Sequence, residues 1–239
     1  AGMTVTISDG ATMTVAANKV DGSTGPTLQK DGSSGTGIVA VRIGDADKAV
    51  NMTTISSSGA ASTTFTVFEN IDDFTGTLAA ATSVNSGVTL GISAAKATTK
   101  TISGLGNVSI SALHSTLAAD LTGVTAGGTK TATFGGSATF AGDLGNVSVT
   151  VTAGNTMDTT AAKANGKSIT AAGDANITIT ALHSTPSADL SGLAKGSGTI
   201  TATFGGTNTF TGVLGLASVS VTAGNTMTIS AAKAAGKTI

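Results

Sequence analysis

The sequence predicts an all-β protein built as a repetitive β-solenoid of the parallel β-helix type, and three observations lead to this class. A block of about seventy residues recurs along the chain. Within each block, short runs alternate apolar and hydroxyl residues with the period of two that is typical of strands. Only 3% of the residues are aromatic and Trp, Tyr and Cys are absent, so the chain lacks the side chains of an ordinary bulky core.

The recurrence is visible in the residues themselves. The segment 157–167 returns as 227–237, a shift of 227 − 157 = 70. Self-similarity at a fixed period is typical of repeat proteins, in which each unit buries its apolar face against its neighbours. The predicted repeats are a divergent first repeat with an inserted loop at 1–78, then 79–145, 146–215 and a partial repeat at 216–239.

Strands are expected where β-branched residues alternate with Ser or Thr, as in the Val-Ser-Val-Thr-Val run at 147–151. Gly-Asn, Gly-Gly and Gly-Lys pairs separate these runs and favour turns. The only helical candidates are the Ala-Ala-Lys segments, which are too short to be stable helices in water. In the third repeat we predict strands at 147–151, 156–160, 167–170, 176–181, 188–191, 198–204 and 207–211.

Two architectures fit this spacing of strands. In a β-solenoid, a coil has three short strands and about three coils fill one repeat. In the alternative, each repeat is a small β-sandwich within a tandem array. The solenoid is favoured because a sandwich of about seventy residues needs a dense core or disulfides, whereas coils share one interior.

Composition and charge exclude several classes of function. The formal net charge is −1 and the basic residues are scattered, so nucleic-acid binding is not expected. No run approaches eighteen apolar residues, so no membrane-spanning helix is predicted. The first residues lack a basic stretch followed by an apolar one, so we expect no signal peptide there.

The two ends of the array differ from its middle. The first repeat contains Gly- and Ser-rich segments at 21–26 and 30–35, which predict an inserted loop. The last repeat stops at Ile239, where earlier copies continue into another strand, and exposed strand edges pair with other edges. We therefore expect either a chain cut from a longer one or subunits that stack end to end.

Acidic residues cluster only in the first repeat and are the candidate metal ligands. Clustered carboxylate oxygens are the ligands that Ca²⁺ prefers. The spacing matches neither an EF-hand loop nor a calcium-binding β-roll, so a solvated loop is the competing interpretation. The candidate calcium ligands are Asp45, Asp47, Glu69, Asp72 and Asp73; no other cofactor is predicted.

His-Ser-Thr segments with a nearby Asp occur twice. His114 with Asp120, and His183 with Asp189, place the residue types of a serine hydrolase in one short stretch. Catalytic triads are assembled from distant segments and need an oxyanion hole, so we interpret the segment as a recurring turn whose Asp accepts backbone N–H bonds. No nucleotide-binding, zinc or protease motif is present in the sequence, which therefore predicts a non-enzymatic protein.

Two other recurring features have competing interpretations. The paired lysines, such as Lys163 and Lys167, form either a basic ladder for polysaccharide or phosphate or, as we favour, solvated corners that protect strand edges. Thr-x-Thr segments resemble ice-binding arrays. Such arrays need identical rows in every coil, whereas the motif recurs only once per seventy residues.

The segments 222–239 and 106–113 resemble those of very large, repetitive bacterial surface proteins of the β-strand-repeat or adhesin-like kind. The resemblance implies an extracellular or cell-surface location and a cell-attached or filament-forming role. We therefore predict a non-enzymatic structural protein of an extracellular fibre, sheath or surface layer that associates with itself. The alternative is an adhesin segment that binds a surface or cell-surface glycan through its divergent first repeat. In a further hypothesis, bound calcium stabilises the protein.

Overall fold

The computed structural model describes residues 4–20, 27–30, 37–54, 57–58 and 62–239. These residues form two compact units. Unit 1 holds the described residues of 1–110 together with 123–130, and unit 2 holds 111–122 together with 131–239. Each unit is described by itself.

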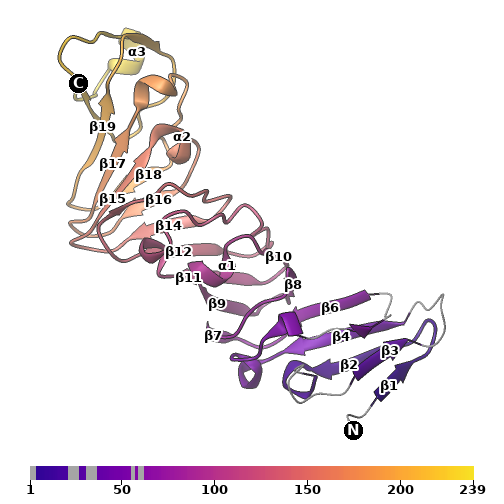
Figure 1. Ribbon diagram of the computed structural model, residues 1–239. Helices are drawn as coiled ribbons and strands as arrows, with labels where there is room; N and C mark the ends of the chain where they lie inside the picture. Colours follow the sequence, from indigo (N-terminus) through magenta and orange to yellow (C-terminus); the bar gives the residue numbers. More distant parts are fainter. Residues whose placement is uncertain (1–3, 21–26, 31–36, 55–56, 59–61) are drawn as a thin grey trace. The chain divides into compact units, whose positions relative to one another are not determined.

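Unit 1 is made of strands joined by turns and single helical turns (Figure 1). Its strands are β1 (Thr4–Ile7), β2 (Thr12–Ala16), β3 (Thr27–Lys30), β4 (Ile38–Ile43), β5 (Ser57–Ser58), β6 (Ser62–Val67), β7 (Ile71–Phe74), β8 (Ala81–Val84), β9 (Thr89–Ser93), β10 (Thr101–Gly104) and β11 (Asn107–Ser111), whose last residue belongs to unit 2. Its helical turns are the 3₁₀ turns η1 (Ala17–Lys19), η2 (Asp45–Asp47) and η3 (Met52–Thr54) and the one-turn helix α1 (Ala94–Ala97).

The strands of unit 1 form three sheets. β1, β3 and β5 make one, and β2, β4, β6, β8 and β10 make the second, in that order. β7, β9 and β11 are neighbours in the third. Figure 1 shows β2, β4 and β6 side by side. Consecutive strands of a sheet are separated in sequence by strands of other sheets, which is the connectivity of a coil.

Unit 2 continues the same pattern of short strands and single turns. Its strands are β12 (Lys130–Phe134, whose first residue belongs to unit 1), β13 (Ala138–Thr139), β14 (Ser148–Val151), β15 (Thr156–Thr160), β16 (Ile169–Ala171), β17 (Asn176–Thr180), β18 (Leu193–Lys195), β19 (Ile200–Phe204), β20 (Asn208–Phe210), β21 (Ser218–Val221) and β22 (Met227–Ile229). Its helical turns are η4 (Leu113–Ser115), α2 (Ala161–Ala164), η5 (Leu182–Ser184) and α3 (Ala231–Ala234).

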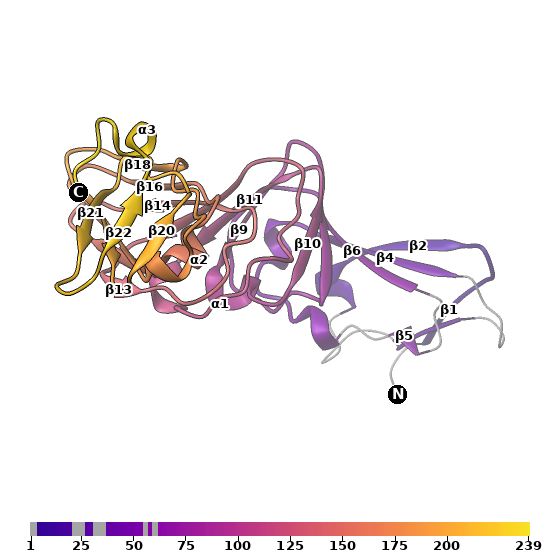
Figure 2. The same ribbon diagram turned by 90° about the horizontal axis from the view of Figure 1, so that it is seen from above.

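Unit 2 also has three sets of paired strands. β12, β14, β16 and β18 are neighbours in one sheet, and β13, β15, β17, β19 and β21 form the second. β20 and β22 form the third, and both lie near the C-terminus in Figure 2. All strand pairs assigned a register within the described residues are parallel, as in β15 with β17 and β17 with β19.

The parallel pairing confirms the predicted β-solenoid. A β-sandwich is built from antiparallel strands, so the alternative of tandem small sandwiches is wrong for the described part of the chain. Parallel strands need a crossover, and here the other two sides of the coil provide it. Apolar residues stack inward in register, for example Val149 with Ile169 and Ile169 with Leu193, and all three are at most 2% exposed.

Three successive coils together are shorter than the seventy-residue repeat, so each copy of a strand lies in the next sheet. Stacked residues lie 17 apart for Ala202 and Val219 (219 − 202) and 24 apart for Ile169 and Leu193 (193 − 169). In the sheet of β12, three coils lead from Ala132 to Leu193, or 61 residues. One repeat is therefore three coils plus one strand. Accordingly β12 and β14 lie in the first sheet, whereas their copies β19 and β21 lie in the second.

The recurring Phe-x-Gly segments are closely packed points of the interior. Phe140 and Phe210 are 1% exposed. A Cβ atom on Gly142 would lie 2.2 Å from the Ala119 carbonyl oxygen and 2.7 Å from Cζ of Phe140, and Gly212 has the same surroundings. Only glycine fits there, because the chain passes directly over the coil below with the phenyl ring tucked under it.

The structure corrects the predicted local structure at two points. The Ala-Ala-Lys segments do form helices, α1, α2 and α3, of one turn each. In α1 and α2 two alanines are buried, and this packing supplies stability that an isolated turn lacks. The strand predicted at 188–191 is reduced to an isolated bridge between Asp189 and Val213, and the strand begins later, at Leu193. Asp189 instead accepts the N–H of Ser191 and so makes a turn.

Most of the inserted loop predicted in the first repeat falls at 21–26 and 31–36, outside the described residues. The adhesin hypothesis depends on this loop and stays a prediction.

Candidate functional site

The acidic residues of the first repeat include one buried carboxylate, that of Asp47, which is 3% exposed. Its Oδ2 accepts the N–H of Gly44 at 2.8 Å and its Oδ1 accepts the N–H of Asn18 at 2.9 Å. The first bond closes the turn η2, and the second joins it to η1 in the coil below. Asp47 therefore acts as a structural link between two coils.

The other four predicted calcium ligands are exposed. Asp45 pairs with Lys48 at 3.4 Å, and Asp72 and Asp73 lie on β7 with Glu69 shortly before it. Within the described part of the chain, no three Asp, Glu, His or Cys side chains are grouped so that they could hold a metal ion. The structure thus does not bring the five predicted ligands together, and calcium binding stays a prediction.

The His-Ser-Thr segments form corners of the coil. Each begins after an alanine in the left-handed conformation, Ala112 or Ala181, both with φ of 54°. The His183 ring packs edge-on against Phe204 with 6.2 Å between ring centroids. It also lies under Gly206, where a Cβ atom would be 2.6 Å from the imidazole Cδ2. The Gly-Gly pair after the phenylalanine therefore makes room for the histidine of the preceding coil.

The carboxylates of these corners are held by their own turns. Oδ1 of Asp120 accepts the hydroxyl of Thr122 at 2.6 Å and its N–H at 3.0 Å. These two bonds lower the pKa of Asp120 from its ordinary value of 3.8, the hydroxyl contributing most. The hydroxyl and then the N–H of Ser191 lower the pKa of Asp189 in the same way. The predicted turn, with Asp accepting a backbone N–H, is confirmed.

A serine and a histidine do approach each other in one corner. Oγ of Ser184 lies 3.1 Å from Nε2 of His183. The neighbouring carboxylate of Asp189 bonds Ser191 instead. In the other copy, Nδ1 of His114 accepts the N–H of Gly135 at 3.3 Å. The two copies do not repeat one Ser-His-Asp geometry.

Four of the paired lysines contact backbone carbonyls of the preceding coil, which the sequence did not reveal. The ammonium groups donate to glycine oxygens: Lys96 to Gly76 at 2.8 Å, Lys167 to Gly145 at 2.6 Å, Lys233 to Gly212 at 2.9 Å, and Lys237 to Gly215. Each such bond satisfies a carbonyl at a tight turn. Successive pairs follow strands of different sheets, β15 and β22, so the repeat does not build one straight basic ladder.

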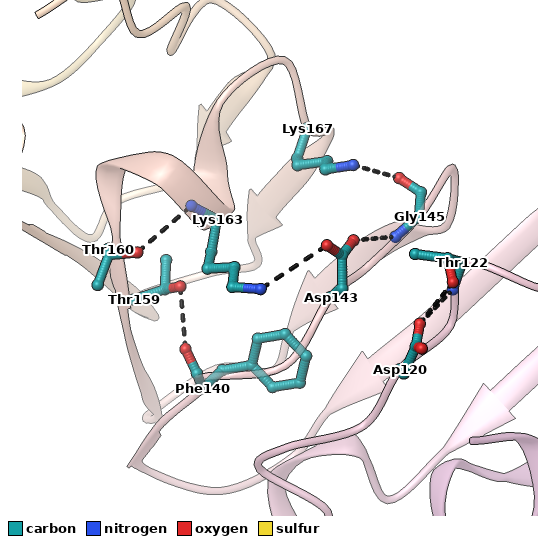
Figure 3. Close-up of polar contacts among 9 residues, drawn as sticks. All are labelled: Asp120, Thr122, Phe140, Asp143, Gly145, Thr159, Thr160, Lys163 and Lys167. Carbon is teal, nitrogen blue, oxygen red and sulfur yellow. Dashed lines mark hydrogen bonds and ion pairs between the residues drawn. The ribbon is translucent and has the colours of Figure 1, made fainter. Parts of the chain in front are cut away.

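Lys163 contacts a carboxylate instead, as Figure 3 shows. Its ammonium lies 3.7 Å from Oδ2 of Asp143, whose Oδ1 accepts the N–H of Gly145 at 3.0 Å. In the next copy Val213 replaces Asp143, and Lys233 turns to a glycine carbonyl instead. One substitution thus redirects the lysine without changing the fold.

Rows of hydroxyl side chains run across the outer side of the sheet of β13, β15, β17, β19 and β21. Because coils stack in register, one residue of each strand contributes to a row. The longest row contains Thr139, Asp158, Thr178, Thr201 and Ser218, all half-buried or exposed. A parallel row pairs Thr160 with Thr180 and Thr203 with Ser220.

These rows bear on the ice-binding interpretation, for which the sequence analysis required similar residues in every coil. The Thr-x-Thr motif recurs once per repeat, but Thr139, Asp158 and Ser218 occupy the equivalent positions of other strands, so the longest row has a polar side chain in each of its five strands. Neighbouring rungs are about 4.8 Å apart, the spacing of adjacent strands. The result is a regular polar face with one acid, Asp158, in five rungs.

Comparison of the chain with protein-family models, with curated proteins and with solved structures gives no match. In the described residues, no helix combines the length and the apolar character needed to cross a membrane.

Proposed function

We propose that this chain is a non-enzymatic structural protein of an extracellular fibre, sheath or surface layer that associates with itself through its β-rich coils. The observation that carries the proposal is the set of registered hydroxyl rows on the outer side of the β13–β21 sheet. Hydroxyl groups both donate and accept hydrogen bonds, so two such faces are chemically complementary. With 10% charged residues in the chain, little electrostatic repulsion opposes their approach.

The interior supports the same proposal. Val, Ile, Leu, Ala and Phe side chains fill it, and the Phe-x-Gly and Lys-to-carbonyl contacts join several coils to the one below. Strand ladders that run through many coils give stiff, regular assemblies. The resemblance to large bacterial surface proteins supports the extracellular location.

Lateral association is tested by placing like charges in the longest row. The double variant T178K/T201K changes two outward residues that pair directly across adjacent strands. The control variant S187K places one charge on an exposed turn residue outside the rows. We expect the parent and control to assemble with rising concentration in sedimentation and electron microscopy, and the double variant to need roughly tenfold more protein, because facing like charges repel. A parent that stays monomeric at high concentration would contradict the proposal.

The same rows favour a second candidate, binding to ice. A regular row of polar side chains across five strands, four of them hydroxyls, is suited to ordering a layer of water. Growth of single ice crystals in the presence of the chain tests this. Shaped crystals and a lowered freezing point with the parent, but not with T178K/T201K, would support it; unchanged crystal growth would exclude it.

A further inference from the structure

A hollow of about 200 Å³ lies within unit 1, in the sheet of β2, β4, β6, β8 and β10. It is lined by residues 63–65 of β6, 81–83 of β8 and Ser103 of β10, three strands labelled in Figure 1. The register between β6 and β8 covers only two residue pairs, whereas the register between β4 and β6 covers six. The ladder between β6 and β8 therefore stops short, and the hollow lies where the two strands are not paired.

The hydroxyl of Thr82 lies in the wall of this hollow without a hydrogen-bond partner among the described residues. Thr82 is 2% exposed, and burying a hydroxyl group without a hydrogen bond costs stability. The equally buried Thr159 avoids this cost, because its hydroxyl donates to the Phe140 carbonyl at 3.0 Å. A ligand in the hollow would give the Thr82 hydroxyl the partner that the chain does not supply.

The rest of the lining combines an aromatic ring with further hydroxyl groups. Phe65 is half-buried, whereas five of the other six phenylalanines are at most 1% exposed. Ser83 and Ser103 are half-buried and lie opposite each other in the register of β8 and β10. Of the described residues that line the hollow, none is charged. The lining therefore offers an apolar ring and groups that both donate and accept hydrogen bonds.

We propose that this hollow binds one neutral sugar ring, a hexopyranose. The C–H groups of a pyranose form an apolar face that packs against an aromatic ring such as that of Phe65. Its hydroxyl groups donate and accept hydrogen bonds, and one of them supplies the partner for Oγ1 of Thr82. Pockets for drug-sized ligands measure about 300 to 1,000 Å³, so the smaller hollow suits a single ring.

The proposed sugar site is independent of the proposed self-association. It lies within residues 63–103 of unit 1, whereas the hydroxyl rows lie on the β13–β21 sheet of unit 2. A negative result for sugar binding would therefore leave the proposed function standing.

Saturation-transfer NMR of the full chain with glucose, galactose, mannose and N-acetylglucosamine, each alone, tests the proposal. We expect saturable binding of at least one of these sugars. Thr82→Val and, separately, Phe65→Leu should each weaken that binding at least tenfold. If the methyl glycoside binds as well as the free sugar, the ligand is a unit of a glycan; if only the free sugar binds, the ligand is a free sugar. No binding of any of the four sugars, or binding that Thr82→Val leaves unchanged, would overturn the proposal and leave a hollow filled by water.

Thermal unfolding separates a ligand-binding hydroxyl from a structural one. Because the Thr82 hydroxyl has no partner in the free chain, Thr82→Val should melt at the same temperature as the parent or higher. The matched control Thr159→Val loses a bonded hydroxyl, so it should melt lower and still bind the sugar as the parent does. The bound sugar should raise the melting temperature of the parent but not that of Thr82→Val. A Thr82→Val variant that melts clearly below the parent would show that the hydroxyl serves the fold, and would overturn the proposal.

Discussion

The glycine of each Phe-x-Gly segment lies so close to the backbone of the coil below that it has no room for a side chain. A Cβ on Gly142 would lie 2.2 Å from a backbone oxygen, which cannot move aside as a flexible side chain can. Other glycines, such as Gly154, have a positive φ but no neighbour within 4 Å of such a Cβ. The two kinds of glycine therefore have different physical reasons for their presence.

The substitution Gly142→Ala should destabilise the chain by about 3 kcal/mol, because the coil must move to admit the methyl group. The control Gly154→Ala should cost only about 1 kcal/mol, since only the left-handed backbone is strained. Urea denaturation followed by circular dichroism measures both. Equal losses in the two variants would mean that the close contact is absent.

Asp47 is the second residue with a structural task, because its buried carboxylate holds two backbone N–H groups. We expect Asp47→Ala to cost about 3 kcal/mol, since it leaves both donors without a partner. The loss should be the same with and without EGTA. A loss that appears only when calcium is present would instead assign Asp47 to a metal site.

The carboxylate of Asp120 links stability to pH. Its pKa is lowered in the folded chain, so it contributes stability above its unfolded value near 3.8 and loses it as the pH falls through the lower folded value. Thr122→Val removes the hydroxyl hydrogen bond, which is the largest cause of the lowered pKa, and should raise the pKa of Asp120 toward 3.8. NMR titration of the carboxyl carbon measures this. An unchanged pKa would show that the hydroxyl does not bond the carboxylate in solution.

At the scale of the element, the sequence predicted the strands better than the contacts between them. Period-two alternation identified β14, β15 and β17 nearly to the residue, since it follows directly from which side chains face inward. The strand at 188–191 was predicted wrongly because Asp189 uses its carboxylate to make a turn. The lysine contacts and hydroxyl rows could not be predicted, because the coils range from 17 to 29 residues and no fixed spacing reveals which residues stack.

The lysine contacts can be separated by their response to salt. Lys167→Met removes a charge-assisted hydrogen bond to a neutral carbonyl and should cost about 1.5 kcal/mol, nearly independent of ionic strength. Lys163→Met removes an exposed ion pair and should cost less than about 1 kcal/mol, falling further in 1 M NaCl. Denaturation of both variants at low and high salt measures this. If the stability lost on Lys167→Met disappears in 1 M NaCl, Lys167 does not act through a hydrogen bond to a neutral carbonyl.

At the scale of the whole molecule, the seventy-residue repeat of the sequence does not correspond to a self-contained domain of the structure. Each repeat is three coils and one further strand, and its outer coils lie against coils of neighbouring repeats. Phe140 and Phe210 are 1% exposed, and Phe210 pairs with Ile229 of the coil that follows. Stability should therefore depend on the number of stacked coils, as in other repeat proteins.

The same relation explains why the candidate sites were only partly predictable. A shift of seventy residues takes a side chain to the next sheet, so equivalent residues of successive copies face different directions. Residues that recur every seventy positions in the sequence therefore do not stack on one another. The hydroxyl rows of the structure are formed by residues from different positions of the repeat.

The most direct test of this account is the thermal unfolding of residues 146–215 alone, compared with the full chain. The segment contains one complete repeat, but its first and last coils lose the strands on which they stack, including β13 and β22. The account predicts a gradual change in circular dichroism for the segment and a cooperative transition for the full chain. A sharp, cooperative transition of the isolated segment would show that one repeat builds its own interior, and would contradict the central claim.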